Sequence, residues 1–375
     1  MTHKIPYNKP FMSGQELTYI KQAVESGKIS GDGMFSKKCH AFFEERYGFK
    51  KALLTTSCTD ALEMAAILLN IEVGDEVIMP SYTFVSTANP FVLRGANIKF
   101  VDSLPDHPNM DVSKVEALIT SKTKAIICVH YAGMACDMDA LMAICEKHKV
   151  ELIEDAAQAI ESTYKGKQLG TFGSMASFSF HETKNIISGE GGLLGINDEK
   201  YALRAEIIRE KGTNRSQFFR GEVDKYGWVD IGSSFLPSEI IAAFLFAQLE
   251  MIETIQAKRV AIWERYAANL ESLSTKIGLP QIPQHAVSNG HIFHVICQSI
   301  EDRDALILFL KERGFHAVFH YLSLHTSPFF KANYDGSDLP FTDFYSERLL
   351  RLPLFYELEL HEVDAISEAI KAYYQ

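Results

Sequence analysis

The feature that most constrains the fold is an alternation of short apolar runs with amphipathic stretches from residue 51 to about residue 200. The runs have the length of buried strands, and the stretches between them have the spacing of helices that bury one face. The expected strands are residues 52–55, 77–79, 98–101, 125–129 and 152–154, and the expected helices are residues 59–69, 86–93, 112–119 and 138–148. This order predicts an α/β fold with a large, mostly parallel sheet covered by helices on both faces.

A different pattern begins near residue 237. Residues 238–270 read as one long helix with an apolar face, followed by an expected strand at 291–297, a helix at 302–313, a strand at 316–319 and a final helix at 361–374. A chain of 375 residues is long enough for two domains. We therefore expect a large domain over residues 1–250 and a smaller α+β domain over residues 251–375.

Composition excludes several classes of protein. Hydrophobic residues make up 47% and charged residues 23%, as in an ordinary globular protein, and the net charge of −11 disfavours a nucleic-acid-binding surface. No apolar run is long enough to cross a bilayer, and residues 1–7 lack the apolar stretch of a secretory signal. We expect a cytoplasmic protein that binds neither nucleic acid nor membrane.

Cysteine spacing gives no sign of a metal site or a disulfide framework, because no Cys-x-x-Cys pair occurs. We expect free thiols and no bound metal. The six cysteines are Cys39, Cys58, Cys128, Cys136, Cys145 and Cys297.

Residues that follow the expected strands are the candidate site, because ligands of parallel sheets bind at the carboxyl ends of the strands. Ser57, Cys58 and Thr59 follow the first strand and open a helix. The free N–H groups of a first helical turn bind phosphate, and the hydroxyl groups can add hydrogen bonds. The competing interpretation is that Ser57 or Thr59 only caps the helix.

A carboxylate ends another expected strand. Glu154 and Asp155 follow the apolar run at 152–153, where a buried carboxylate needs a cationic or hydrogen-bonding partner. A protonated pyridine nitrogen is such a partner, and an acid that keeps it protonated makes the ring an electron sink. A helix cap is the alternative reading of Asp155.

Lys184 follows a further strand-like run, residues 177–180, and precedes the glycine-rich stretch 189–192. An amine among apolar neighbours loses solvation, which lowers its pKa and makes it nucleophilic toward an aldehyde. The alternative is a solvated surface lysine.

His181 and Glu182 begin a zinc-protease pattern, but Asn185 stands where that pattern requires a second histidine, so this interpretation is rejected.

Phe84 follows the expected strand at 77–79, where its ring could stack on a flat cofactor or belong to the core. A phosphate turn, a stacking ring, a carboxylate and a lysine along one sheet edge favour pyridoxal 5′-phosphate (PLP). NAD is disfavoured because no Gly-x-Gly-x-x-Gly follows the first strands, and no Walker loop is present.

These motifs resemble those of the DegT/DnrJ/EryC/StrS sugar aminotransferases, which have the aspartate-aminotransferase fold (PLP fold type I). The resemblance covers almost the whole chain. The matching stretches are Ser-x-Thr-x-Ala-Leu at 57–62, Glu-Asp-Ala-Ala-Gln at 154–158, Phe-Ser-Phe-His-x-x-Lys-Asn at 178–185 and Gly-Glu-Gly-Gly at 189–192.

The resemblance implies a role for each matching residue. Lys184 would form the Schiff base with PLP, Asp155 would pair with the pyridinium, and Gln158 would bind the ring hydroxyl. Phe84 would stack on the ring. The cofactor phosphate would be held by Cys58, Thr59 and Ser179, beside Ser57, which is a candidate from its position at the start of the helix.

Two positions depart from the family pattern. Cys58 replaces the usual glycine of the phosphate turn, although its backbone N–H remains. Leu236 stands where many members have an asparagine that reaches the phosphate of the partner subunit, so Ser233 or Ser234 would have to replace that contact. The family resemblance also implies a homodimer with shared active sites.

Three further stretches, at 80–89, 130–136 and 211–221, are similar to one subgroup of the family. That subgroup transfers the amino group of L-glutamate to C4 of TDP-4-keto-6-deoxy-D-glucose in enterobacterial common antigen synthesis. The products would be TDP-4-amino-4,6-dideoxy-D-galactose and 2-oxoglutarate.

A basic cluster is the candidate site for the TDP-sugar, since arginine suits phosphate, and residues of the expected small domain could face the sugar. The candidates are Lys211, Asn214, Arg215 and Arg220, with Tyr321, His320 and His325.

Other functions remain open at this point. A related enzyme could aminate C3 or give the other C4 epimer, with the same cofactor residues. A dehydratase of the family would carry histidine in place of Lys184. A non-catalytic PLP-binding regulator could share the scaffold, because fold does not guarantee activity. An NAD-linked oxidoreductase is the fourth alternative.

Overall fold

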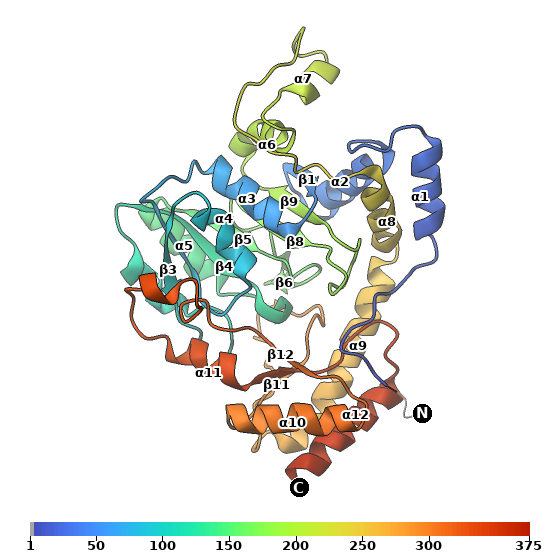
Figure 1. Cartoon of the computed structure of the whole chain (residues 1–375), viewed down its shortest axis with the longest axis vertical. Helices are drawn as coiled ribbons and strands as arrows, with labels where there is room; N and C mark the ends of the chain where they lie inside the picture. The colour runs from blue at the N-terminus through green and yellow to red at the C-terminus, as the bar shows by residue number, and fades with distance from the viewer. Residues whose placement is uncertain (1–3) are drawn as a thin grey trace.

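The computed structural model describes residues 4–375, so the first three residues of the N-terminal stretch considered above lie outside the described residues. A seven-stranded sheet with the order β1-β9-β8-β5-β4-β2-β3 forms the centre of the molecule (Figure 1). Its strands are β1 (Lys51–Thr55), β2 (Glu76–Pro80), β3 (Asn97–Val101), β4 (Thr123–Val129), β5 (Glu151–Asp155), β8 (Met175–Ser179) and β9 (Gly192–Ile196). The five strands expected between residues 52 and 154 are confirmed.

Strand β9 alone runs against the other strands of this sheet. It pairs antiparallel with both β1 and β8, whereas the remaining pairs are parallel. The carboxyl ends of the other six strands therefore meet at one edge, and β9 begins at that edge with Gly192. The expected mostly parallel α/β sheet is confirmed.

Helices cover both faces of the sheet (Figure 1). One face is covered by α3 (Cys58–Leu68) and α4 (Asn89–Val92), and the other by α5 (Met138–His148), α2 (Met34–Tyr47) and α8 (Glu239–Leu249). The expected helices at 59–69 and 138–148 are confirmed. The expected helix at 112–119 is wrong: residues 112–114 and 116–118 form two separate 3₁₀ turns. The one at 86–93 is a 3₁₀ turn, Val85–Thr87, followed by the short α4.

The long helix expected over residues 238–270 is two helices. Helix α8 ends at Leu249 and α9 (Ile252–Leu270) begins after a bend of 62°. Helix α8 packs on α1 (Glu16–Glu25) and α2, while α9 packs on α12 (Leu360–Tyr374). The chain thus changes its packing partners at residues 250–251, where the division into two domains is predicted.

A second, three-stranded antiparallel sheet follows. It has the order β11-β13-β12, from β11 (His294–Ile296), β13 (Leu349–Arg351) and β12 (Val318–Phe319). Helices α9, α10 (Ile300–Glu312) and α12 bury their apolar faces around Phe293, Val295 and Leu350. Helix α11 (Pro340–Arg348) leads into β13. A small third sheet joins β10 (Ala286–Val287), β6 (Thr163–Tyr164) and β7 (Lys167–Gln168).

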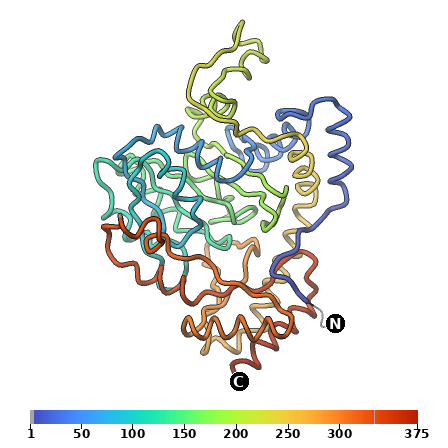
Figure 2. The backbone as a smooth tube through the Cα atoms, viewed as in Figure 1, coloured from blue at the N-terminus to red at the C-terminus, as the bar shows by residue number. Residues whose placement is uncertain are grey.

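Residues 213–231 form an arm that projects beyond α6 (Ala202–Arg209) and carries α7 (Arg215–Phe219) at the top of Figures 1 and 2. No single helix in the described part of the chain is long and apolar enough to cross a bilayer. Helices α8 and α9 have that length and composition only when they are taken together across their bend.

Candidate active site

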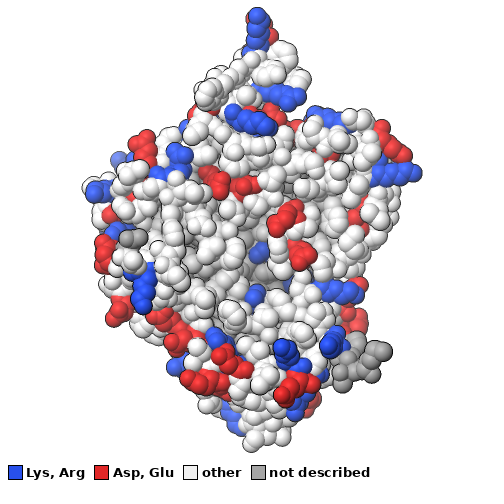
Figure 3. Space-filling model, viewed as in Figure 1, with Lys and Arg blue, Asp and Glu red and all other residues white. Residues whose placement is uncertain are grey.

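A cavity of about 1330 Å³ lies at the carboxyl edge of the large sheet and extends to the small sheet. Its walls come from the segments that follow β1, β2, β5 and β8 and from residues 318–328, which begin with β12 of the three-stranded sheet. The centre of the face shown in Figure 3 is mostly uncharged, apart from a few basic atoms that lie below the surrounding surface. Acidic and basic side chains lie around this central region. Ten of the residues predicted from sequence line this cavity: Ser57, Cys58, Thr59, Phe84, Asp155, Gln158, Ser179, Lys184, His320 and Tyr321.

The first turn of α3 forms one wall. The Ser57 hydroxyl accepts a hydrogen bond from the N–H of Asp60 at 3.1 Å, so Ser57 does cap the helix. Thr59 donates to the Ser86 hydroxyl at 2.8 Å. Backbone N–H groups of a first helical turn have no acceptor within the helix, and Ser57, Cys58 and Thr59 line the cavity. Capping and anion binding are therefore compatible at this turn.

Gly192 allows β9 to approach this turn closely. A Cβ atom at residue 192 would lie 2.4 Å from the carbonyl carbon of Ser57 and 2.5 Å from the nitrogen of Cys58. Only glycine fits this contact without displacement of the turn. The glycine-rich stretch after Lys184 thus shapes the anion-binding turn from the neighbouring strand.

Asp155 ends β5 and is buried at the base of the cavity. Its Oδ2 accepts a hydrogen bond from the Thr87 hydroxyl at 2.7 Å, and its Oδ1 accepts from the N–H of Ala157 at 3.2 Å. Burial raises the pKa of Asp155, and these hydrogen bonds oppose the shift. The described residues form no ion pair with this carboxylate, so a cationic ligand group would find an unneutralised partner here.

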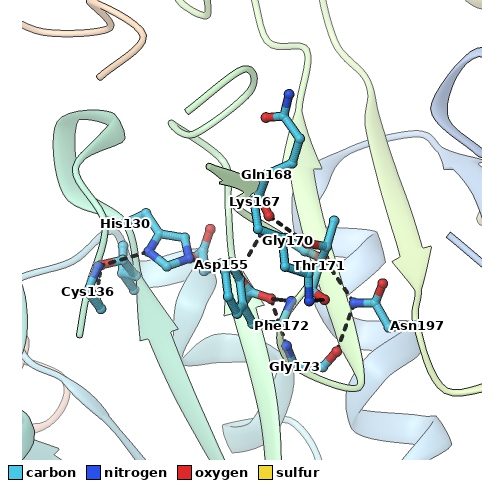
Figure 4. A network of polar contacts seen from close by, with 12 residues as sticks. His130, Cys136, Asp155, Lys167, Gln168, Gly170, Thr171, Phe172, Gly173 and Asn197 are labelled. Atoms are coloured by element: carbon cyan, nitrogen blue, oxygen red, sulfur yellow. Dashed lines mark hydrogen bonds and ion pairs between the residues drawn. The ribbon is translucent and has the colours of Figure 1, made fainter. Parts of the chain in front are cut away.

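Glu154, the residue before Asp155, has a structural role. Its carboxylate accepts hydrogen bonds from the N–H groups of Gly170, Phe172 and Gly173 at 2.7–2.8 Å and contacts Nε2 of His130 at 3.1 Å. Figure 4 shows Phe172 and Gly173 on one side of this network and His130 on the other. The network fixes the end of β5 and thereby the position of Asp155.

The same network includes a buried thiol cluster. The N–H of Cys136 donates to Nδ1 of His130 at 3.3 Å, as Figure 4 shows. The side-chain ligand atoms of Cys128, His130 and Cys136 lie within 4.8 Å of one another, so these residues could hold a metal ion. Cysteine spacing gave no indication of this grouping.

Lys184 lies in the connection between β8 and β9. Hydrogen bonds from Phe180 N to Gly191 O at 2.8 Å and from Glu182 N to Gly189 O at 2.9 Å hold this connection together. Burial lowers the pKa of the Lys184 amine, and the charge of Arg351 acts in the same direction. A lysine in this setting has a larger neutral, nucleophilic fraction than one in water.

The residue after Lys184 is anchored by helix α9 and by residues 289–291. The Asn185 amide donates to Gln256 Oε1 of α9 at 2.8 Å and to the carbonyl of Asn289 at 3.0 Å, and it accepts from His291 Nδ1 at 2.8 Å. All four residues are buried. The main chain beside Lys184 therefore has little freedom to move.

Gln158 joins the two sides of the cavity. Its Oε1 accepts from the N–H of Ala132 at 2.6 Å, and its Nε2 donates to the Tyr321 hydroxyl at 2.9 Å. The ring centroid of Phe84 lies 6.0 Å from that of Tyr321, and Phe84 is 55% exposed. Phe84 is thus a cavity-wall residue and not part of the core.

The remaining predicted residues lie outside the cavity of this chain. Lys211, Asn214, Arg215 and Arg220 are on or beside the arm, and Arg220 is paired with Glu206 and Glu222. Ser234 is exposed and bridges to Glu210. His325 is buried against the Ser81 hydroxyl at 2.8 Å.

Sequence reasoning missed several cavity residues. Tyr7, Thr87, His291 and Arg351 all line the cavity. Thr87 lies in the stretch 80–89 that follows β2, where sequence analysis assigned it no role, and the other three lie outside the motifs. Arg351 had one usable signal, because it interrupts the apolar run Leu349–Leu354. Tyr7 and His291 are brought in by packing between distant segments.

Comparison with known proteins decides the family. The model of the DegT/DnrJ/EryC1/StrS aminotransferase family matches residues 10–371. The chain belongs to this family. Like other DegT/DnrJ/EryC1/StrS members, the protein is a PLP-dependent sugar aminotransferase, as predicted.

Solved structures of similar proteins agree with this assignment. Spr1654 of Streptococcus pneumoniae, assigned as a sugar aminotransferase, has been solved in PMP and PLP forms. It is 27% identical to this chain, with a TM-score of 0.92, and the match covers 99% of this chain and 98% of Spr1654. DesV of S. venezuelae, solved with a ketimine intermediate, shares 29% identity at a TM-score of 0.90, covering 99% of each chain. The aminotransferase TlmJ of Streptoalloteichus hindustanus shares 28% identity at 0.91, again over 99% of each chain.

Proposed function

We propose that the enzyme transfers the amino group of L-glutamate to C4 of TDP-4-keto-6-deoxy-D-glucose, giving TDP-4-amino-4,6-dideoxy-D-galactose and 2-oxoglutarate. The observation that carries the cofactor half of this proposal is that Lys184 and Asp155 line one cavity. They are close enough for the charge of each to shift the pKa of the other. The sugar half rests on the resemblance of the stretches 80–89, 130–136 and 211–221 to one subgroup of the family.

The cavity residues fit PLP. Asp155 is a buried carboxylate that forms no direct ion pair with the described residues, as a pyridinium partner should be. Gly192 lets β9 lie close to the first turn of α3, and Ser57, Thr59 and Ser179, which could bind a phosphate, line the cavity. Lys184 supplies the amine that the cofactor aldehyde requires.

In the proposed mechanism, PLP when bound supplies an electron sink for the charge that develops at the reacting carbon. The Lys184 amine removes the proton from the α-carbon of glutamate and later delivers a proton to C4 of the sugar, acting first as base and then as acid. Its lowered pKa keeps a neutral fraction available for the first step. Asp155 holds the ring nitrogen protonated, with Thr87 fixing the orientation of the carboxylate.

We further propose that two copies of the chain form a homodimer through the arm. The arm and its base expose apolar side chains: Phe219 at 68%, Trp228 at 84% and Val229 at 54%, with Phe218, Tyr226 and Ile231. Exposed apolar patches of this kind are typical of interfaces. In the dimer, Lys211, Asn214 and Arg215 would lie near the partner's cavity, where they could contact the TDP diphosphate.

The experiment that tests the reaction is product analysis. The purified enzyme with PLP is given glutamate and TDP-4-keto-6-deoxy-D-glucose, and the product is examined by NMR. We expect nitrogen on C4 in the galacto configuration. Nitrogen on C3, or the gluco epimer at C4, would contradict the proposed substrate specificity while leaving transamination intact.

A further inference from the structure

A buried cluster of two thiols and an imidazole lies behind the cofactor cavity and has no part in the proposed reaction. Cys128, His130 and Cys136 are each at most 1% exposed, and none of them lines the cavity. Val129 does line it, and the side chains of neighbouring strand residues point to opposite faces of the sheet. Cys128 therefore points away from the cavity, into the core on the other face.

The spacing of the three side chains suits a single metal ion. Their ligand atoms lie within 4.8 Å of one another, and no other group of three histidine, cysteine or acidic side chains among the described residues meets this condition. In a tetrahedral zinc site, with metal–ligand bonds of about 2.0–2.3 Å, the ligand atoms lie roughly 3.5–3.8 Å apart. The dimensions of the cluster are therefore compatible with zinc.

A short turn returns the chain to the end of β4 and brings the second thiol into place. The turn η4 (Tyr131–Gly133) contains two residues with positive φ, Ala132 at 57° and Gly133 at 77°. The Cys136 thiol then donates a hydrogen bond to the carbonyl of Val129 at 3.3 Å. One loop supplies all three side chains, so the grouping does not depend on contacts between distant segments.

The imidazole of His130 has the orientation of a metal ligand. Its Nδ1 accepts the N–H of Cys136 at 3.3 Å, so the ring proton is on Nε2, which donates to Glu154 at 3.1 Å (Figure 4). The Glu154 carboxylate also accepts three main-chain N–H groups, which fix its position. Metal-binding histidines almost always donate their second ring N–H to a carboxylate, a carbonyl or water. The Nδ1 lone pair is left on the side of Cys136, where only one long hydrogen bond competes for it.

We propose that Cys128, His130 and Cys136 bind one Zn²⁺ ion through two thiolates and Nδ1. Binding releases two protons, one from each thiol, and the two thiolate charges cancel the charge of the ion, so no net charge is buried. Two sulfur ligands exclude Mg²⁺ and Ca²⁺, which prefer oxygen. The carbonyl oxygen of Val129, beside the Cys136 sulfur, is placed to complete a tetrahedron.

The proposed ion is structural, because its ligands do not line the cavity. It would fasten the turn at 131–133 to the end of β4. The N–H of Ala132 in this turn donates to Oε1 of Gln158 at 2.6 Å, and Gln158 does line the cavity. The ion would therefore brace the cofactor pocket from the opposite face of the sheet.

Metal analysis of the whole enzyme tests the site without any substrate. The chain is produced without a histidine tag in medium supplied with zinc, exchanged into zinc-free buffer by size-exclusion chromatography, and analysed by elemental mass spectrometry. We expect one zinc ion per chain in wild type, and His130→Gln and Cys136→Ser should each lose most of it. The matched control is Cys297→Ser, which changes another buried cysteine outside the cluster and should retain the ion.

X-ray absorption at the zinc edge identifies the ligands in wild type alone, so it decides the proposal even if a variant fails to fold. Two sulfur neighbours at about 2.3 Å and at least one nitrogen neighbour at about 2.0 Å are expected. Zinc with nitrogen and oxygen neighbours only would place the ion elsewhere on the protein and overturn the proposal.

Two further results would overturn it. Wild type that leaves the column without zinc, or zinc that both cluster variants retain, would exclude binding by these residues. An intact mass lower by two hydrogen atoms, restored by a reducing agent and absent from Cys136→Ser, would show that Cys128 and Cys136 form a disulfide in place of thiolate ligands. None of these measurements involves transamination, so the proposed function is tested separately.

Discussion

The hydroxyl of Thr87 donates a hydrogen bond to Oδ2 of Asp155 at 2.7 Å, and both side chains are buried. Thr87→Val keeps the shape of the side chain and removes this donor. A hydrogen bond to a charged group contributes roughly 1.5–3 kcal/mol, so PLP affinity should fall about tenfold or more. Equilibrium dialysis of PLP measures this. Thr87→Ser retains the hydroxyl and should bind as wild type; equal losses in both variants would contradict the role of the hydrogen bond.

Removal of the Lys184 amine should abolish transamination without unfolding the chain. Lys184→Ala should bind PLP non-covalently, because the phosphate turn and Asp155 remain. Mass spectrometry after borohydride reduction should find PLP attached to wild type and to the exposed-site variant Lys165→Ala, but not to Lys184→Ala. Turnover of Lys184→Ala at the wild-type rate would refute the proposed mechanism.

Gly192→Ala should damage the phosphate turn from outside the cavity. Its new Cβ would lie 2.4 Å from main-chain atoms of Ser57, a contact that forces strands or turn apart. Overpacking of this kind costs about 1–3 kcal/mol, and we expect both a lower melting temperature and weaker PLP binding. Gly227→Ala is the control, since nothing lies within 4 Å of a Cβ at residue 227. Identical behaviour of the two variants would show that β9 tolerates the methyl group.

Acid should destabilise the fold through buried histidines. Burial lowers the pKa of His294 to about 3, below the ordinary value near 6.5. Between pH 3 and pH 6.5 the unfolded chain binds one proton more than the folded chain at this histidine. The stabilisation that the neutral, buried His294 provides is therefore complete above pH 6.5 and is lost as pH falls toward 3. His294→Leu should reduce the pH slope of the unfolding free energy by up to about 1.4 kcal/mol per pH unit between pH 4 and 6. Denaturant titrations at several pH values measure the slope, with His361→Gln as an exposed control. An unchanged slope in His294→Leu would contradict the assignment.

Polar substitutions on the arm should dissociate the proposed dimer. Trp228→Ser combined with Phe219→Ser removes the two most exposed aromatic rings of the arm. Light scattering after size-exclusion chromatography should show a monomer for this variant and a dimer for wild type. Val73→Ser is a matched control, because Val73 is 88% exposed on another part of the surface. A variant that remains dimeric would place the interface elsewhere.

Strand-end residues of the site could be predicted because their position follows from topology. Ser57, Asp155 and Lys184 are far apart in sequence, but each follows a strand of one sheet, and parallel strands bring their carboxyl ends together. The apolar runs that predict those strands are strong. Convergence of the three residues therefore needed no knowledge of side-chain packing.

Other parts of the fold had no comparable signal. Strand β9 contains Gly192 and Gly195, which favour a turn over a strand, and it forms because β1 and β8 hold it on both sides. The bend at residues 250–251 carries neither glycine nor proline. Arg351 reaches the cavity only because β13 lies between β11 and β12, an arrangement set by tertiary contacts.

The hydrogen bond from Asn185 to Gln256 ties the neighbour of the reactive lysine to helix α9. Since α9 also carries the packing of the C-terminal helix, a rigid-body displacement of that whole unit would be transmitted to the main chain at Lys184. The main chain that carries the proton-transferring amine is therefore joined directly to the helix against which the C-terminal helix packs.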